Sequence, residues 1–119
     1  MRFTVDGGSL FAFAALWTVN HRLAKEPLES CALLTCPPNL LVRPIHDRMP
    51  VVLADPERLR GWLSADLTAE EALTLCEPFP AERMSVGPVS RGVNKAGGAE
   101  GPELFEMPTA DEAEAQLSL

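Results

Sequence analysis

One short segment constrains the fold of this chain more than any other, because a proline stands at each end: Pro44-Ile45-His46-Asp47-Arg48-Met49-Pro50. Proline fixes its own φ angle and restricts the residue before it, so residues 45–49 are predicted to lie outside the interior of a helix. The segment also places His46, one of two histidines, two positions before Arg48. A proton-transfer group near a permanent cation suits a site for an anionic substrate. The alternative is a surface turn with a hydrogen-bonded histidine.

The acidic residues are concentrated toward the C-terminus. The 119 residues carry a net charge of −7, which on its own argues against a nucleic-acid partner. Six carboxylates follow Lys95 with no basic residue among them: Glu100, Glu103, Glu106, Asp111, Glu112 and Glu114. Residues 1–95 therefore have a net charge of only −1, and a locally positive patch is compatible with the composition.

Composition also bounds the class of protein. Hydrophobic residues make up 46% of the chain, enough for a core, and the length suits one small domain or part of a larger one. No apolar run approaches the ~20 residues of a membrane span. Residues 1–6 lack the pattern of a signal peptide, so a cytoplasmic protein without membrane contact is predicted.

The three cysteines, Cys31, Cys36 and Cys76, lack the C-x-x-C spacing of zinc and redox sites. They are predicted to be buried thiols that act as small hydrophobic residues, with no metal or other cofactor. The alternative is a zinc site built from Cys31, Cys36 and a histidine.

Turn residues divide the first half of the chain into strands. Residues 2–5 and 9–16 are predicted to form a hairpin, because Asp6-Gly7-Gly8 supplies the positive φ angles of its turn. The second strand, continuing to Trp17, is apolar on both faces and is predicted to be buried. A loop over 18–29, a strand over 30–35, a helical turn over 39–42 and a strand over 51–53 follow.

Two helices are predicted after the strands. Asp55 can cap the first, which begins at Pro56 and places Leu59, Trp62 and Leu63 on one face. The segment Thr68-Ala69-Glu70-Glu71 is a capping box for the second, which ends before Pro78. A last strand is predicted over 86–90. The order indicates an α+β fold of mostly antiparallel strands with two short helices, followed by an acidic, disordered tail over 109–119.

Several segments, in order, resemble one family: Phe11-Ala12-Phe13-Ala14-Ala15-Leu16-Trp17, Leu33-Leu34-Thr35, Ile45-His46-Asp47-Arg48-Met49-Pro50-Val51, Trp62-Leu63, Pro88-Val89-Ser90-x-x-Val93-Asn94 and Pro102-Glu103-Leu104. Together they are similar to the SOS response-associated peptidase (SRAP) family, which senses and shields abasic sites in single-stranded DNA. The likeness implies that residues 1–108 form the C-terminal portion of an SRAP-like domain, part of a β-barrel-like fold.

The resemblance implies roles for three residues. His46 matches a family histidine that acts in acid–base steps, and Arg48 matches an arginine that holds the DNA backbone. Thr35 is a candidate to donate a hydrogen bond to phosphate. The alternatives are an Arg48–Asp47 ion pair and a purely structural threonine. In the family a cysteine after the initiator methionine captures the sugar aldehyde as a thiazolidine; Arg2 stands at that position here.

Three functions remain open. The first is the C-terminal part of an abasic-site crosslinking protein and thiol autopeptidase, with single-stranded DNA and a complementary N-terminal chain as partners and no activity alone. The second is a noncatalytic binding module derived from that family. The third is a hydrolase that uses Cys36 and His46.

Aromatic and polar residues outside the proline-bounded segment have mainly structural interpretations. Trp17 and Trp62 can stack on bases, but both are predicted in the core. Ser90 and Asn94 are expected to shape the last strand through local hydrogen bonds. A solvated charged face is expected for three further cations: Arg43, Arg58 and Arg60.

Overall fold

The computed structural model describes residues 1–22, 25–98 and 101–106. The strands are β1 (Arg2–Val5), β2 (Ala12–Phe13), β3 (Ala15–Asn20), β4 (Leu28–Leu33), β5 (Thr35–Cys36), β6 (Met49–Pro50), β7 (Val52–Leu53) and β8 (Met84–Gly87). The helices are α1 (Pro56–Trp62) and α2 (Ala69–Leu75), with short 3-10 helices at Ala81–Arg83, Arg91–Asn94 and Pro102–Phe105. No helix within these ranges is long and apolar enough to cross a bilayer.

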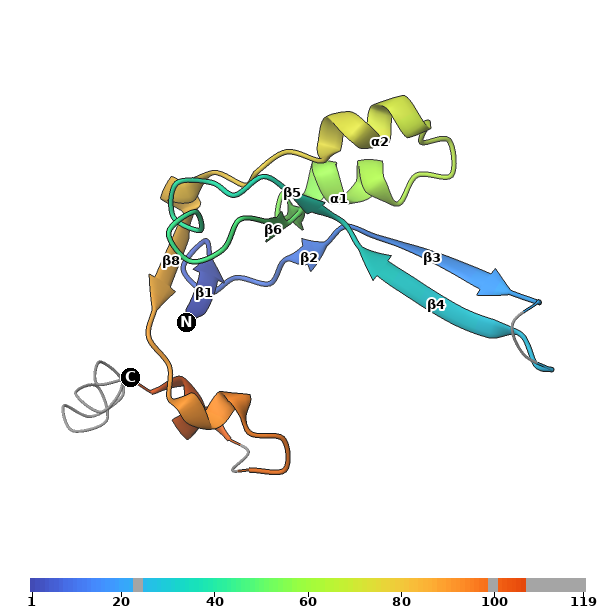
Figure 1. The fold of residues 1–119 in the computed structure, drawn as a ribbon. Helices are drawn as coiled ribbons and strands as arrows, with labels where there is room; N and C mark the ends of the chain where they lie inside the picture. Colours follow the sequence, from blue (N-terminus) through green and yellow to red (C-terminus); the bar gives the residue numbers. More distant parts are fainter. Residues whose placement is uncertain (23–24, 99–100, 107–119) are drawn as a thin grey trace.

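The strands pair two by two, and every pair is antiparallel. β1 pairs with β8, β2 with β7, β3 with β4, and β5 with β6, so the described residues form four two-stranded sheets and no closed barrel. The helices α1 and α2 form a layer at one side of the strands (Figure 1). The predicted α+β class of mostly antiparallel strands with two short helices is confirmed.

The predicted hairpin between residues 2–5 and 9–16 is wrong, although its turn exists. Asp6, Gly7 and Gly8 do have positive φ angles, of 46°, 70° and 100°. The strand after the turn nevertheless pairs with β7, and β1 pairs with β8 instead. Three successive positive φ angles bend the chain out of the plane of β1, and a local turn signal does not specify which strand receives the hydrogen bonds of β1.

The segment from Ala15 to Leu33 is a second correction. The predicted loop over 18–29 overlaps two strands at its ends: β3 runs to Asn20 and β4 begins at Leu28, and together they form a two-stranded ribbon that projects from the body (Figure 1). The predicted burial of Trp17 and Cys31, which face each other across this ribbon, is wrong, since Trp17 is 72% exposed and Cys31 is exposed. The apolar sequence indicated the strand correctly, but no described element covers it.

A small core positions the proline-bounded segment. Its buried residues are Val5, Ala14, Cys36, Val42, Met49, Val51, Val52, Leu53 and Phe79. Asn39 begins the predicted turn over 39–42, where its side-chain oxygen accepts hydrogen bonds from the N–H groups of Leu41 (3.1 Å) and Val42 (3.0 Å). The Asn39 amide also donates to the carbonyl oxygen of Phe79 (2.7 Å). This residue therefore ties the loop to a segment that follows 40 residues later in the chain.

The helices begin where the sequence predicts. Thr68 and Glu71 form the expected capping box at α2. α1 starts at Pro56 with Asp55 as N-cap, but the Asp55 side chain caps nothing. Leu59 and Trp62 pack against the core as expected. Leu63, which was predicted on the same face, is exposed. The last strand, β8, starts at Met84, two residues before the start of the predicted strand. The predicted tail over 109–119 lies outside the described residues.

Arg83 joins three segments that are far apart in sequence. Its guanidinium binds both carboxylate oxygens of Asp6 (2.9 and 2.6 Å) and lies 2.9 Å from an oxygen of Asp55, which explains why Asp55 does not cap α1. The same group lies over the Phe79 ring, 4.7 Å from its centre. The hydrogen bond from Arg83 is the main reason that the pKa of Asp6 is lowered.

An Arg83→Met variant tests this contact through its pH dependence. A carboxylate whose pKa is lower in the folded state stabilises the fold above its ordinary pKa of about 3.9 and loses that contribution as the pH falls through the folded pKa. We expect a lower melting temperature than the parent at pH 7 and a difference that narrows below about pH 4. Thermal melts by circular dichroism measure it, with Arg60→Met as control. A difference that is constant from pH 7 to pH 3 would contradict the coupling.

Candidate functional site

The loop between β5 and β6 carries the site and is held at both ends. The N–H groups of Ile45 and His46 donate to the carbonyl oxygen of Val42 at 2.8 and 3.0 Å, and Val42 is buried. Met49, at the other end, is also buried. Residues 45–48 stand out from the body as an irregular turn, as the two prolines predict. The buried residues Val42 and Met49 fix the two ends of the loop, and the exposed residues between them leave the His46 ring accessible.

The imidazole of His46 has partners for both of its protonation states. The Arg48 backbone N–H donates to Nδ1 at 3.0 Å, which suits the neutral ring with its proton on Nε2. The Arg48 carbonyl oxygen at 3.0 Å and an Asp47 carboxylate oxygen at 3.1 Å face the same nitrogen and would accept a proton from it. The side chain is 67% exposed. The loop can therefore hold the ring before and after a proton transfer.

Thr35 orients the guanidinium of Arg48. Nε and Nη2 donate to the Thr35 hydroxyl oxygen at 3.1 and 3.0 Å, and Nη2 also donates to its carbonyl oxygen at 2.6 Å. None of the ion pairs among the described residues involves Arg48, so the alternative pairing with Asp47 is not found. The guanidinium is held by neutral groups, and its positive charge stays available for an anion.

An apolar hollow of about 430 Å³ lies directly beside these three residues. Thr35, His46 and Arg48 line it together with apolar side chains that include Phe13 and Ile45. Phe13 packs edge to face on Phe11 with ring centres 5.4 Å apart. This aromatic pair was not predicted from the sequence as part of the site, although phenylalanines two apart on a strand share one face.

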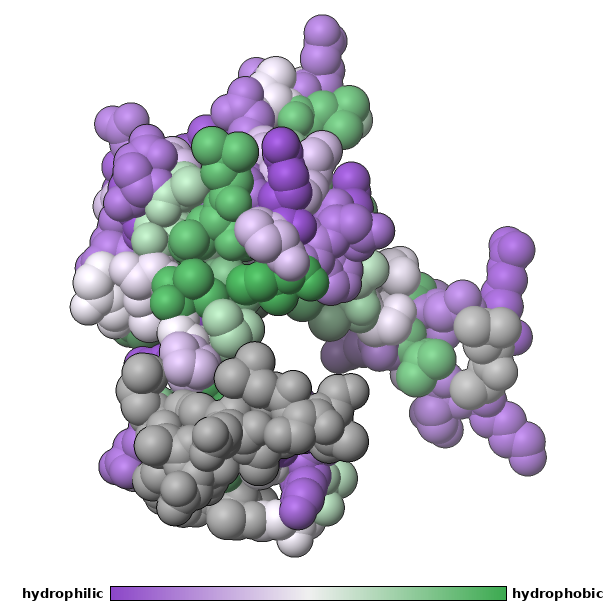
Figure 2. Space-filling view, turned by 60° about the vertical axis from the view of Figure 1, so that its left-hand side comes forward, coloured by the Kyte–Doolittle hydropathy of each residue, from purple (hydrophilic) through white to green (hydrophobic). Residues whose placement is uncertain are grey.

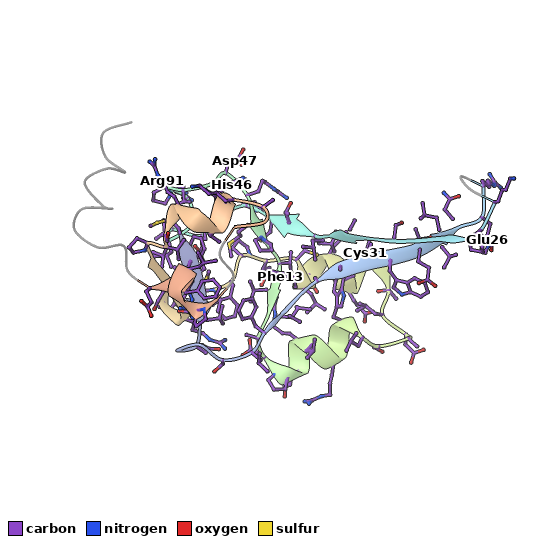
Figure 3. All side chains as sticks on the ribbon, turned by 90° about the horizontal axis from the view of Figure 1, so that it is seen from below. Phe13, Glu26, Cys31, His46, Asp47 and Arg91 are labelled. Atoms are coloured by element: carbon purple, nitrogen blue, oxygen red, sulfur yellow. The ribbon has the colours of Figure 1, made fainter. Side chains whose placement is uncertain are left out.

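The cysteines do not join the site. Cys31 lies on the β3–β4 ribbon, far along the molecule from His46 (Figure 3). Cys36 is buried, and burial raises the pKa of its thiol, which disfavours the thiolate that a hydrolase needs. Among the described residues no group of three or more His, Cys, Asp or Glu could hold a metal ion, so the proposed Cys31–Cys36 zinc site does not form.

The remaining candidates are structural or exposed. Arg58 donates to the carbonyl oxygen of Leu75 at 2.8 Å and lies 3.8 Å from Glu77. Ser90 accepts a hydrogen bond from the Gly92 N–H at 3.2 Å, as expected for a residue that shapes a turn. Arg43 is exposed on the same loop as His46. These residues add no further group to the cluster of Thr35, His46 and Arg48.

Comparison with known proteins relates most of the chain to one family. The family model described as SOS response associated peptidase (SRAP) matches residues 1–96. The chain is 38% identical over 107 residues to "Abasic site processing protein YoqW" of Bacillus subtilis (strain 168), covering 89% of this chain and 47% of that protein. It is 37% identical over 107 residues to "Abasic site processing protein YobE" of the same organism, covering 46% of it.

A solved structure agrees with these relatives. The crystal structure of a protein from Bacteroides thetaiotaomicron superimposes with a TM-score of 0.74 at 21% identity, covering 89% of this chain and 47% of that one. The chain therefore spans about half the length of the relatives that it matches.

Proposed function

The chain belongs to the SOS response associated peptidase (SRAP) family, and we propose that it binds single-stranded DNA at abasic sites as part of a two-part abasic site processing protein. The observation that carries this proposal is the Thr35–Arg48 contact next to His46. It presents an oriented guanidinium, without a carboxylate partner in the described residues, at a solvent-exposed loop. Such a group suits a backbone phosphate, since planar donors match phosphate oxygens.

In this proposal His46 moves protons at the damaged sugar. The ring-opened abasic site carries an aldehyde, and a cysteine amine supplied outside this chain adds to it with loss of water, giving an imine. The cysteine thiol then adds to the imine carbon and closes a thiazolidine, a covalent protein–DNA link. Both steps transfer protons, and a histidine with partners for two protonation states suits them. The same cysteine would serve as nucleophile in the family's autopeptidase activity.

The proposal is tested by capture of an abasic oligonucleotide. We expect the chain alone to form no heat-stable adduct on a denaturing gel, because its thiols, Cys31, Cys36 and Cys76, are internal and lack the adjacent free amine. Addition of the half of YoqW that this chain does not match is expected to give an adduct. If the chain alone forms an adduct, and the adduct still forms after all three cysteines are substituted, the proposal that the reacting cysteine is supplied outside this chain is wrong.

A second candidate function is a noncatalytic binding module, favoured by the Arg48 guanidinium, which Thr35 holds and which has no carboxylate partner among the described residues. It would bind single-stranded DNA weakly and in a salt-sensitive manner, at the nucleoid in the cytoplasm. The gel separates the two functions. If DNA is bound but the two halves together yield no adduct, the binding module is supported; an adduct from the two halves rejects it.

A further inference from the structure

We propose that the face of the β1–β8 sheet that points away from the hollow carries a phosphate-binding groove, separate from the Thr35–Arg48 contact. Arg2, Thr4 and Ser85 supply its polar groups, and its volume is about 280 Å³. We call it the β1–β8 groove. The inference goes beyond the proposed function, because it involves neither residue of the Thr35–Arg48 contact and requires no abasic site.

The two faces of the β1–β8 sheet carry different side chains, since successive residues of a strand point to opposite faces. Phe3 and Val5 line the hollow, whereas Arg2 and Thr4 line the groove. The antiparallel register places Ser85 opposite Thr4, so both hydroxyls belong to the groove face. Among the described residues none lines both cavities, and the groove is therefore a site of its own.

The groove also differs in chemistry from the apolar surface of the chain. Figure 2 shows hydrophobic side chains gathered in a patch on one face of the molecule, and side chains of this kind form most of the hollow. The groove instead combines one cation and two hydroxyl groups with the aromatic ring of Phe105. No aspartate or glutamate is among the described residues that line it. An anion in the groove therefore meets a positive charge without a competing carboxylate.

The polar side chains of the groove make no hydrogen bond or ion pair to the rest of the described chain. Arg2 is absent from the ion pairs found there, and its side chain donates to no protein oxygen. The hydroxyls of Thr4 and Ser85 likewise have no protein partner in the described part, and Ser85 is exposed. The donors of all three side chains are thus available to a ligand.

The Phe105 ring positions the Arg2 guanidinium. The central carbon of the guanidinium, Cζ, lies 5.3 Å from the centre of the ring, within the range of a cation–π contact. Phe105 ends the 3-10 helix Pro102–Phe105, so this contact joins β1 to a segment that follows β8. A guanidinium on an aromatic ring keeps its N–H donors in its own plane, where they can bind an oxyanion. Less side-chain freedom is then lost when a ligand binds.

Phosphate is the anion that these groups fit best. The planar donors of arginine match phosphate oxygens, and serine and threonine hydroxyls are common donors to the same group in nucleic-acid complexes. Gly87, opposite Arg2, leaves the approach open, since a Cβ there would meet no atom within 4 Å. The groove is also large enough for part of the group that carries the phosphate. The expected ligand is a phosphate ester, in the backbone of a DNA strand or on a free nucleotide.

An NMR titration of the backbone amides tests the groove on the full chain. The chain carries Arg48→Ala, which removes the phosphate contact of the proposed function, and receives sodium phosphate or, as reference, sodium acetate at equal ionic strength. We expect saturable shifts of the Thr4 and Ser85 amides with phosphate and not with acetate. Arg2→Gln removes the charge and is expected to weaken phosphate binding about tenfold. Arg60→Gln, which changes an exposed cation on α1 outside the groove, is expected to leave it unchanged.

Two further probes identify the source of the phosphate. Deoxyadenosine monophosphate and an undamaged single-stranded oligonucleotide are titrated into the same chain. If the oligonucleotide binds more tightly than the nucleotide and Arg2→Gln removes the difference, the groove takes the backbone of a DNA strand. If the nucleotide binds at least as tightly as the oligonucleotide, the groove takes a free nucleotide.

Three results would contradict the groove: no saturable shift with any of the three phosphate probes, equal shifts with acetate and phosphate, or equal weakening by Arg2→Gln and Arg60→Gln. Thr4→Val removes one hydroxyl and keeps a β-branched residue in the strand. It is expected to weaken phosphate binding less than Arg2→Gln does, with an unchanged circular dichroism spectrum, which guards against a loss of fold. DNA binding that depends on Arg48 is measured separately, so failure of the groove and failure of the proposed function are distinguishable.

Discussion

Replacing His46 with glutamine is expected to slow covalent capture of an abasic site by the assembled two-part protein about 100-fold, the lower end of what a positioned acid–base group contributes. Glutamine keeps a polar side chain of similar reach but cannot gain or lose a proton near neutral pH. The imidazole stands 67% exposed on its loop, so the substitution leaves the buried anchors Val42 and Met49 untouched. The measurement is the rate of adduct formation with an abasic oligonucleotide on a denaturing gel.

His21→Gln is the matched control, because His21 is exposed and lies outside the residues that line the hollow. We expect its rate to equal that of the parent. If the His46→Gln complex forms normally and captures the abasic site at the parent rate, His46 takes no part in the reaction. Equal losses in both variants would point instead to a general effect on the fold.

Short-range features of the sequence predicted the local structure well. The prolines at 44 and 50 correctly exclude a helix, and the Thr68–Glu71 capping box forms as expected. The proline restriction and the capping box each depend only on the conformational preferences of a few neighbouring residues, so both can be predicted from the local sequence. The same holds for His46 and Arg48, which share a loop because they are two residues apart.

Long-range pairing could not be predicted from the same signals. Val5 pairs with Met84, and the Asp6–Gly8 turn carries no information about that partner. The apolar residues of β3 predict burial under the usual assumption that a chain covers its own hydrophobic surface. That assumption fails at Trp17, which no described element covers. The orienting contact from Thr35, 13 positions before Arg48, and the Phe11–Phe13 wall of the hollow likewise require the pairing of β5 with β6 and β2 with β7.

Replacing Arg48 with alanine is expected to weaken binding of the chain to an abasic single-stranded oligonucleotide about tenfold at low salt. The guanidinium is positioned by three hydrogen bonds to Thr35, so its contact with phosphate loses little conformational freedom on binding. Losing one phosphate contact should also reduce the slope of log K against log salt by about 0.7 for a single strand. Fluorescence anisotropy at several salt concentrations measures both quantities.

Thr35→Val and Arg60→Ala separate charge from orientation in this measurement. Valine removes the hydroxyl that holds Nε and Nη2 but leaves the cation, so we expect an affinity loss smaller than that of Arg48→Ala, with the salt slope of the parent. Arg60 is an exposed cation on α1 outside the hollow, and its removal is expected to change neither quantity. If Arg48→Ala and Arg60→Ala each lower the affinity for DNA by the same small amount, binding depends only on the net charge of the chain and not on a specific Arg48 contact. A loss confined to Arg48 and Thr35 would instead mean that the backbone phosphate is recognised by a guanidinium held in one orientation.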